Sequence, residues 1–470
     1  MSIATTPSAA PAAATPGRTS PATASTGRYR DQFIDVLRVA AIVAVVAQHW
    51  LMPVLSYDNG RLSAGNALTT DGAWAITWIS QVMPLVFFAG GAAAAMSLRR
   101  RYVRLGQGPA TSSAWLADRV RRLSLPVLPL AAVWLPLPHL LTWLGVPVQP
   151  VAAGAHVAGQ LLWFLAAYVL VTALTAPALR AHDRWRGAEM VILAAGAVAV
   201  DVVRFTVAGG AGGTSADVLG YVNVVFVWAA IYQAGIMYAS GGLDRLRGRT
   251  AWLTAAAGYG VAALMVAFGP YPASMIGMPG APMSNMNPPT AVLLAVAVGQ
   301  LGLALALRRG IERWASSAPV AHAVTVLSRR LMTIYVWHTP ALVAVAGVAV
   351  IGLGIDTPAP FSEPWREQMG WWLLSLFAVL AVLTQVFGRY ERSPSPTAHA
   401  RPGRVVAAST LVGLGLLTLT LTGFGPLDGQ TLQLGAPLAG SLAVVVGTAL
   451  LRIHQVPGSV ALEEHGRLKA

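Results

Sequence analysis

Long apolar windows constrain what this chain can fold into more than any other feature of its sequence. A helix that rises about 1.5 Å per residue needs roughly 20 apolar residues to cross about 30 Å of hydrocarbon. The chain contains twelve such windows, near 33–54, 73–96, 124–145, 158–179, 188–207, 217–239, 251–268, 290–307, 331–352, 370–388, 405–422 and 436–452. The predicted fold class is therefore an all-α polytopic integral membrane protein.

The basic residues predict which side of the membrane each loop faces. With the N-terminus in the cytoplasm, cytoplasmic segments hold 28 of the 32 Lys and Arg residues, whereas Arg61 and Arg366 fall in outer loops and Arg38 and Arg204 fall within spans. This distribution follows the positive-inside rule, so we expect a cell inner (plasma) membrane protein with both termini in the cytoplasm. The net charge of +14 then reflects topology and attraction to the anionic lipid bilayer, not binding of nucleic acid.

Composition divides the chain into four parts. Residues 1–30 are mainly Ala, Pro, Thr and Ser, which is typical of a disordered cytoplasmic tail and lacks the apolar block of a signal peptide. Ten spans within 31–390 then form one core. A Pro/Ser-rich cytoplasmic linker at 391–404 leads to two extra spans and a short tail at 405–470.

The first span, "DVLRVAAIVAVVAQHW", carries ionisable side chains where lipid would surround them. Arg38 and His49 are eleven positions apart, which at about 100° per residue places them on one helix face, about 16 Å apart along the axis. Asp35 lies one turn before Arg38. Two interpretations follow: the stripe lines a polar cavity, or Arg38 is an anchor paired with Asp35 and His49 is an interfacial residue beside Trp50. The cost of a buried charge, about 2.5–3.5 kcal/mol for arginine, favours the cavity.

Two further groups of polar residues accompany this stripe. Arg119 and Arg122 form an R-x-x-R pair just before the third predicted span, and arginine forks match phosphate oxygens well, although topology alone also explains them. "LMTIYVWHTPAL" places Tyr335 and His338 inside the ninth span. A second histidine within the membrane strengthens the interpretation of the first as functional.

Three other segments are interpreted as mainly structural. The aromatic residues of "LLWFLAAYVL" at 161–170 favour an interfacial aromatic belt. Asp201 and Arg204 are spaced for a structural pair. The uncharged loop at 269–290 either lines an outward-facing mouth or crosses the surface. P-loop, H-E-x-x-H and G-x-S-x-G motifs are absent, and the lack of cysteine excludes disulfides, thiolate metal sites and a cysteine nucleophile; we predict no metal site.

These motifs, taken in order, resemble the membrane acyltransferase-3 family. "FIDVLRVAAIVAVVAQHW" is similar to the family's first-helix signature, in which a basic residue precedes a histidine by eleven positions. "PLVFFAGG" resembles its second helix, with Ala89 where a serine commonly precedes Gly90. "WFLAAY", "IYVWH" and the R-x-x-R pair also resemble family segments. The resemblance covers roughly residues 30–390 and assigns no role to the last two spans.

The resemblance implies a ten-helix core that moves a short acyl group from cytoplasmic acyl-CoA to a hydroxylated acceptor. No tightly bound cofactor is implied, since acyl-CoA is a co-substrate. The acceptor would be a glycan, a glycolipid or another envelope or exported molecule, as in carbohydrate O-acetylation. Arg119 and Arg122 would bind the nucleotide phosphates, assisted by Arg38.

In the same mechanism the pantetheine arm of the donor brings the thioester to His49. That imidazole, kept neutral by a low-dielectric site, would act as general base on the acceptor hydroxyl. Direct attack on the thioester is favoured over an acyl-histidine intermediate. Tyr335 and His338 would orient the acceptor or stabilise the oxyanion.

Two other classes of protein fit parts of the sequence. A proton-coupled secondary transporter would also use twelve spans and a titratable histidine, but the internal repeats and paired helix breaks common in transporters are not evident. A non-catalytic membrane scaffold would tolerate replacement of the arginines and histidines. The sequence leaves the acceptor, the acyl chain and the oligomeric state open.

Overall fold

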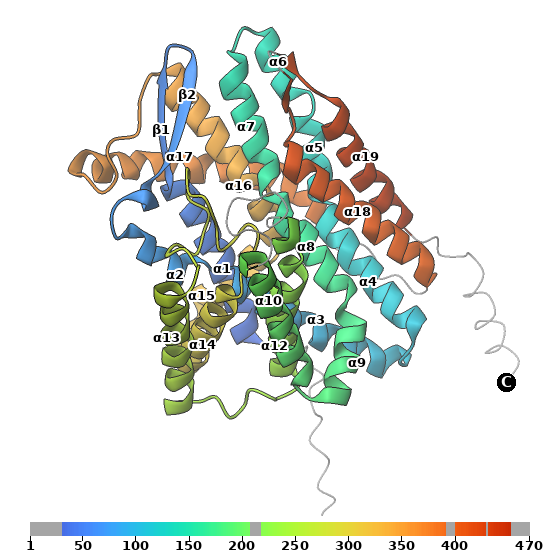
Figure 1. The fold of residues 1–470 in the computed structure, drawn as a ribbon. Helices are drawn as coiled ribbons and strands as arrows, with labels where there is room; N and C mark the ends of the chain where they lie inside the picture. The colour runs from blue at the N-terminus through green and yellow to red at the C-terminus, as the bar shows by residue number, and fades with distance from the viewer. Residues whose placement is uncertain (1–30, 207–217, 392–399, 429–430, 453–470) are drawn as a thin grey trace, which may run out of the picture. The chain divides into compact units, whose positions relative to one another are not determined.

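The computed structural model describes residues 31–206, 218–391, 400–428 and 431–452. The predicted tail at 1–30, most of the predicted linker and the C-terminal tail lie outside these residues. The helices are α1 Gln32–Leu51, α2 Thr77–Ser80, α3 Met83–Leu105, α4 Pro109–Ser124, α5 Val127–Trp134, α6 Leu137–Trp143, α7 Val148–Gln160, α8 Leu162–Ala173, α9 Thr175–Trp185, α10 Ala188–Thr206, α12 Asn223–Ala239, α13 Arg249–Phe268, α14 Val292–Ala315, α15 Ala318–Ser328, α16 Leu331–Ala346, α17 Glu363–Phe387, α18 Pro402–Thr422 and α19 Gly435–Leu450 (Figure 1).

This architecture confirms the predicted all-α polytopic membrane fold. Ten helical stretches of the described chain are long and apolar enough to cross a membrane. The other two predicted spans correspond to α10, which has 19 residues and carries three charged side chains, and to α19, a shorter apolar helix of 16 residues.

The predicted start of the third span was wrong. The third span was expected to begin at 124, but helix α4 already begins at Pro109, so the R-x-x-R pair lies inside a helix and not in a loop before one. Pro126 and Pro136 stand between α4, α5 and α6, because proline cannot donate the backbone hydrogen bond of a helix interior. The second span was expected from 73, and the helical stretch able to cross the membrane does begin at Ala73, with the continuous helix α3 starting at Met83 after short helical turns.

A hairpin after α1 was not predicted. Strands β1 Pro53–Asp58 and β2 Arg61–Asn66 pair antiparallel, with Pro53 opposite Asn66. The turn between them is Asn59–Gly60, and both residues have positive φ, 49° and 78°. Asn-Gly is the residue pair that adopts a two-residue hairpin turn at least cost, so "DNG" was the available sequence signal.

Glycines let the central helices approach closely. A Cβ on Gly91 of α3 would lie 2.1 Å from the backbone oxygen of Tyr232 in α12, and a Cβ on Gly235 would lie 2.0 Å from the oxygen of Phe88. The "FAGG" segment therefore fits the α3–α12 interface, which no larger residue could occupy without a backbone shift. Helix α1 packs against α3 and against α14 and α16.

The last two helices belong to the same compact unit as the helices before them. Helix α18 packs along α19 and lies against α4, α7 and α8, as Figure 1 shows. Gly415 of α18 and Gly440 of α19 permit close backbone contact between the two helices. At its far end α18 is fixed to α7, where the Phe424 amide donates to the Ala155 carbonyl at 3.0 Å.

The long loop at 269–290 is held to α10 through Asp201. One carboxylate oxygen of Asp201 accepts from the Tyr271 hydroxyl at 3.1 Å and the Ala291 amide at 2.7 Å, and the other accepts from Asn223 at 2.7 Å. Burial, and then the charge of Asp201, raise the pKa of Tyr271, so this hydroxyl stays protonated and donates. Asp201 and Arg204 are each 1 % exposed, consistent with the structural interpretation of this pair.

Candidate active site

The two histidines singled out in the sequence meet in the structure. His49 stands near the end of α1, and His338 lies in the middle of α16. Their ring atoms Nδ1 and Nε2, respectively, are 3.3 Å apart, and the ring centroids are 5.2 Å apart. Helix packing thus joins residues 289 positions apart in the chain.

Backbone carbonyls determine which nitrogen of each ring carries the hydrogen. His338 Nδ1 lies 2.6 Å from the Tyr335 carbonyl and His49 Nδ1 lies 2.8 Å from the Val45 carbonyl. A carbonyl oxygen only accepts, so both Nδ1 atoms are the protonated ones. His338 Nε2 then presents a lone pair to His49 Nδ1–H. His49 Nε2 is left unprotonated, without a hydrogen-bond partner among the residues that the structure describes.

Two tryptophans fix the backbone around this pair. Trp50 Nε1 donates to the carbonyl of His338 at 3.0 Å, and Trp372 Nε1 of α17 donates to the carbonyl of Trp50 at 3.0 Å. Trp50 is only 1 % exposed. It is therefore a buried connection between α1, α16 and α17, which favours the cavity interpretation of His49 over the interfacial one.

Tyr335 lies one turn before His338 in α16, and contacts with α8 and with the residue before that helix hold its side chain. Its hydroxyl donates to the carbonyl of Leu161, between α7 and α8, at 2.7 Å, and its ring meets that of Phe164 edge-on at 5.1 Å. Because the hydroxyl hydrogen is already engaged, Tyr335 in this arrangement positions α16. Its action as an oxyanion donor stays a prediction.

The aromatic segment of α8 was expected to form an interfacial belt, and this was wrong. Phe164 is 3 % exposed and packs between Tyr335 and Phe87 of α3. Phe87 in turn stacks on Trp228 of α12 at 4.5 Å. These rings fill the space between four helices, because large aromatic side chains gain most from burial there.

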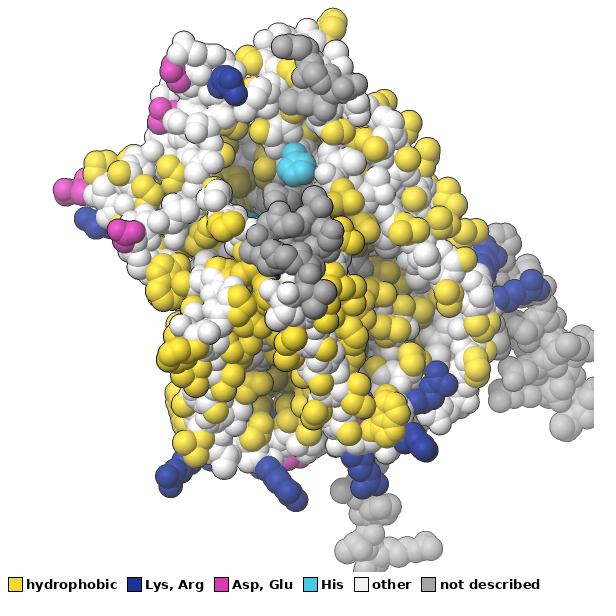
Figure 2. Space-filling view, in the orientation of Figure 1, with side chains coloured by type: hydrophobic (Ala, Val, Ile, Leu, Met, Phe, Trp, Pro, Cys, Tyr) yellow, Lys and Arg dark blue, Asp and Glu magenta, His cyan; other side chains and the backbone are white. Residues whose placement is uncertain are grey.

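A cavity of about 1710 Å³ borders His49. Residues of the hairpin and of the loop at 269–290 line it, which favours the first of the two alternatives that the sequence left open for this loop. Tyr335, Trp163 and Leu116 also line the cavity. In Figure 2 the surface is hollowed beside a histidine side chain, drawn in cyan.

The three predicted donor-binding arginines gather near the other end of α1. Arg38 pairs with Asp35 at 3.9 Å and interacts electrostatically with Arg119 and Arg122. The guanidinium of Arg119 lies 5.5 Å from the ring centre of Trp115. Among the described residues that line the cavity none is one of these arginines, but Leu116, one turn before Arg119, does line it.

Two polar clusters were missed in the sequence. Glu391, just after α17, accepts from the Met332 amide at 2.9 Å and from the amide and hydroxyl of Thr333 at 2.9 and 2.7 Å. It therefore caps the start of α16, the helix that carries Tyr335 and His338. Only contact between helices distant in sequence creates such a cap, so spacing gives no signal for it.

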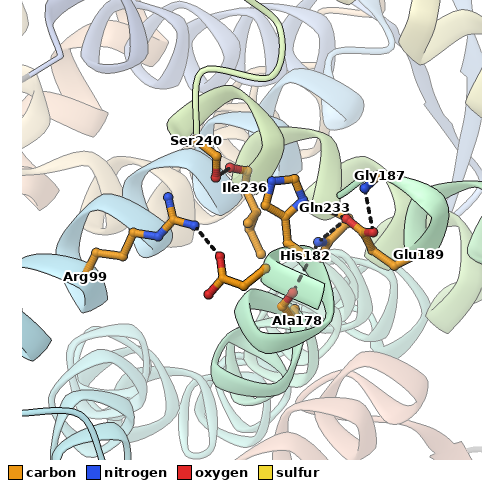
Figure 3. Close-up of polar contacts among 9 residues, drawn as sticks. Arg99, Ala178, His182, Gly187, Glu189, Gln233, Ile236 and Ser240 are labelled. Atoms are coloured by element: carbon orange, nitrogen blue, oxygen red, sulfur yellow. Dashed lines mark hydrogen bonds and ion pairs between the residues drawn. The ribbon is translucent and has the colours of Figure 1, made fainter. Parts of the chain in front are cut away.

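Figure 3 shows the second cluster, in which Glu189 of α10 joins α9 to α12. One oxygen of Glu189 lies 2.7 Å from His182 Nδ1 and accepts from Gln233 at 2.9 Å, and the other accepts from the Gly187 amide at 2.8 Å. Nearby, Arg99 pairs with Asp183 at 3.0 Å. The buried carboxylate is thus satisfied by protein groups, and we assign it a structural role.

Comparison with known proteins places this arrangement in a family. A family model for an acyltransferase domain, that of acyltransferase family 3, matches residues 31–390. The chain belongs to the acyltransferase-3 family. It is accordingly a membrane acyltransferase, and α18 and α19 lie outside the matched region. In the same comparisons no curated protein and no solved structure matched the chain.

Membership of this family separates the predicted classes of protein. An acyltransferase domain covering most of the chain favours an enzyme over the transporter and the scaffold. The structure brings His49, His338 and Tyr335 together and groups the three arginines elsewhere. The individual roles of these residues are proposals, developed next.

Proposed function

We propose that this acyltransferase moves a short acyl group from cytoplasmic acyl-CoA to a hydroxyl of a glycan, glycolipid or other envelope acceptor, with His49 as general base. The observation that carries the proposal is the state of the His49 ring. Its Nδ1–H is held by the protein, its Nε2 is available, and the side chain lines the large cavity.

The proposed reaction balances at one imidazole. His49 Nε2 takes the proton of the acceptor hydroxyl while the acceptor oxygen attacks the thioester carbonyl. As the tetrahedral intermediate collapses, the carbon–sulfur bond breaks and the coenzyme A thiolate leaves. The thiolate then takes this proton from His49. The products are the acylated acceptor and free coenzyme A.

His338 stabilises the charged form of His49 in this scheme. When His49 carries a proton on both nitrogens, its Nδ1–H points to two acceptors, the Val45 carbonyl and His338 Nε2. A catalytic triad uses a carboxylate in the same position to orient and stabilise the imidazolium. Here two neutral acceptors take that place, which suits a site within a membrane, where a buried carboxylate is costly.

The arginine group is the proposed site for the phosphates of the donor. Three guanidinium groups in mutual electrostatic range offer phosphate oxygens several hydrogen-bond donors, with Asp118 and Glu391 also in electrostatic range of Arg122. Arg38 and His49 share one face of α1, about 16 Å apart along its axis. In Figure 2 most Lys and Arg side chains show at the lower and right edges of the molecule and Asp and Glu mainly at the upper left, so by the positive-inside rule we assign the basic end to the cytoplasm.

Release of free thiol from acetyl-CoA by purified protein in vesicles tests the proposal. Substitution His49→Ala should abolish acceptor-dependent release, while His322→Ala, a matched change at an exposed histidine of α15, should not. Mass spectrometry of envelope glycans and lipids, with and without the protein, would identify the ester made. A His49→Ala variant that folds and keeps full transfer activity would exclude His49 as the base.

A further inference from the structure

Helix α18 lies outside the family match, yet it forms one wall of the cavity that His49 lines. Its lining residues include Val406, Thr410, Gly413, Leu417 and Leu421. Their spacing of three or four residues describes one face of a helix, extending over 15 positions or about 22 Å. The opposite face, with Val412 and Leu416 fully buried, packs into the protein.

This face of α18 is mainly apolar and incompletely covered. Val406 is 60 % exposed, Leu414 55 %, Leu417 44 % and Leu421 68 %. Ala166, Leu170 and Ala173 of α8, the helix packed beside α18, line the same cavity. Figure 1 shows α8 and α18 next to each other. We define the groove by these lining residues of α8 and α18 and call it the α8–α18 groove.

The end of the cavity near His49 has a different chemistry. Gln48 and Gln160 line it, and their side-chain amides have no hydrogen-bond partner among the described residues. Gln48 adjoins His49, and Gln160 precedes the Leu161 carbonyl that binds Tyr335. Free amides can bind several hydroxyl groups of a sugar, whereas the mainly apolar side chains of the α8–α18 groove suit a hydrocarbon chain.

We infer that the acceptor is amphipathic: a hydroxylated head group lies between Gln48 and Gln160 beside His49, and its hydrocarbon chain lies in the α8–α18 groove. The inference rests on the proposed function and specifies its acceptor class. The cavity combines a polar region at the base with a long apolar region, and a lipid-anchored sugar has the same two parts. Helix α18 thereby gains a role, as a wall that selects acceptors with a chain.

Gly413 offers a way to fill the groove without disturbing the fold. A Cβ at Gly413 meets no heavy atom within 4 Å, and the residue lines the cavity. Gly403, on the same helix, also has open space around its Cβ but does not line the cavity. Leucine favours a helix over glycine at both positions, so Gly413→Leu and Gly403→Leu are matched variants expected to fold.

The test uses the full chain in phosphatidylglycerol nanodiscs and a dodecyl glucoside carrying a diazirine on its chain. Light should attach the probe to α18 between Val406 and Leu421, and excess dodecyl glucoside, but not methyl glucoside, should compete. Gly413→Leu should reduce labelling by about tenfold, as expected when a hydrophobic pocket loses room for its ligand, and Gly403→Leu should not reduce it. Equal labelling of both variants, or equal competition by phospholipid, would overturn the inference.

Two further outcomes separate this inference from the proposed function. Competition by dodecanoyl-CoA but not by dodecyl glucoside would assign the groove to the donor and refute an acceptor chain there. Labelling does not require catalysis, so His49→Ala should label like the unmodified protein. Acyl transfer without labelling of α18 would leave the proposed function intact and refute binding of the acceptor chain in the groove. Labelling of α18 without any acyl transfer would support the groove and refute the proposed function.

Discussion

Replacing His338 by phenylalanine tests whether this residue supports His49 or performs the chemistry itself. Phenylalanine keeps the ring but removes Nε2, which lies 3.3 Å from His49 Nδ1, and it also removes the Nδ1–H donated to the Tyr335 carbonyl. The second acceptor of His49, the Val45 carbonyl at 2.8 Å, remains. We therefore expect His49 to keep its tautomer and lose one of two acceptors.

The expected loss in rate follows from the one hydrogen bond that the substitution removes. A hydrogen bond to a charged group contributes about 1.5–3 kcal/mol, and a 3.3 Å contact belongs at the low end of that range. Since about 1.4 kcal/mol changes a rate tenfold, kcat should fall about tenfold in His338→Phe, with KM for acyl-CoA unchanged. Loss of a general base in His49→Ala should cost about 10²–10⁴-fold.

Thiol release at saturating acyl-CoA measures kcat, and thermal unfolding in the same vesicles reports whether the variant is folded. His338 is fully buried, so His338→Asn, which restores a polar group of smaller size, provides a second variant. A folded His338→Phe protein with unchanged kcat would refute a supporting role. A loss as large as that of His49→Ala would show that His338 itself takes the proton.

Three other predictions address the surroundings of this site. Arg119→Ala should raise KM for acyl-CoA by about tenfold or more with a smaller change in kcat, because a charge-assisted phosphate contact is lost; a KM equal to that of the unmodified protein would contradict the phosphate role. Glu391→Gln removes one acceptor from the cap of α16, so hydrogen exchange at Met332 and Thr333 should accelerate, whereas unchanged protection there would mean that Glu391 does not hold this helix end. Gly91→Ala places a Cβ 2.1 Å from the Tyr232 backbone oxygen and should destabilise the protein by about 1–3 kcal/mol. The control variant Gly310→Ala places its Cβ in open space and should not destabilise it. Equal unfolding temperatures for the two variants would argue against close α3–α12 contact.

The sequence predicted the fold class because membrane insertion imposes a length and a composition on every span. It also predicted that Arg38 and His49 share one face of α1, since both belong to one uninterrupted helix. The sequence predicted the boundaries of the third span less well. The polar residues of α4 look like a loop, and the three helices that follow Pro109 are separated only by prolines.

Contacts between distant segments were beyond local reasoning. The position of His338 beside His49 depends on how α16 packs on α1, and Trp50 stabilises that contact through the His338 carbonyl. Phe164 resembled an interfacial aromatic residue because composition cannot show which face of a helix meets another. The side of α18 that faces the cavity was likewise undetermined until α8 was placed beside it.

The most direct test of the account is a structure of the protein with a non-reactive thioether analogue of acetyl-CoA. The account predicts that the phosphates contact Arg119 and Arg122. It also predicts that the acyl carbon lies close enough to His49 Nε2 for a single acceptor hydroxyl oxygen to fit between them. An analogue whose phosphates bind elsewhere, or whose acyl group lies away from the cavity that His49 lines, would contradict it.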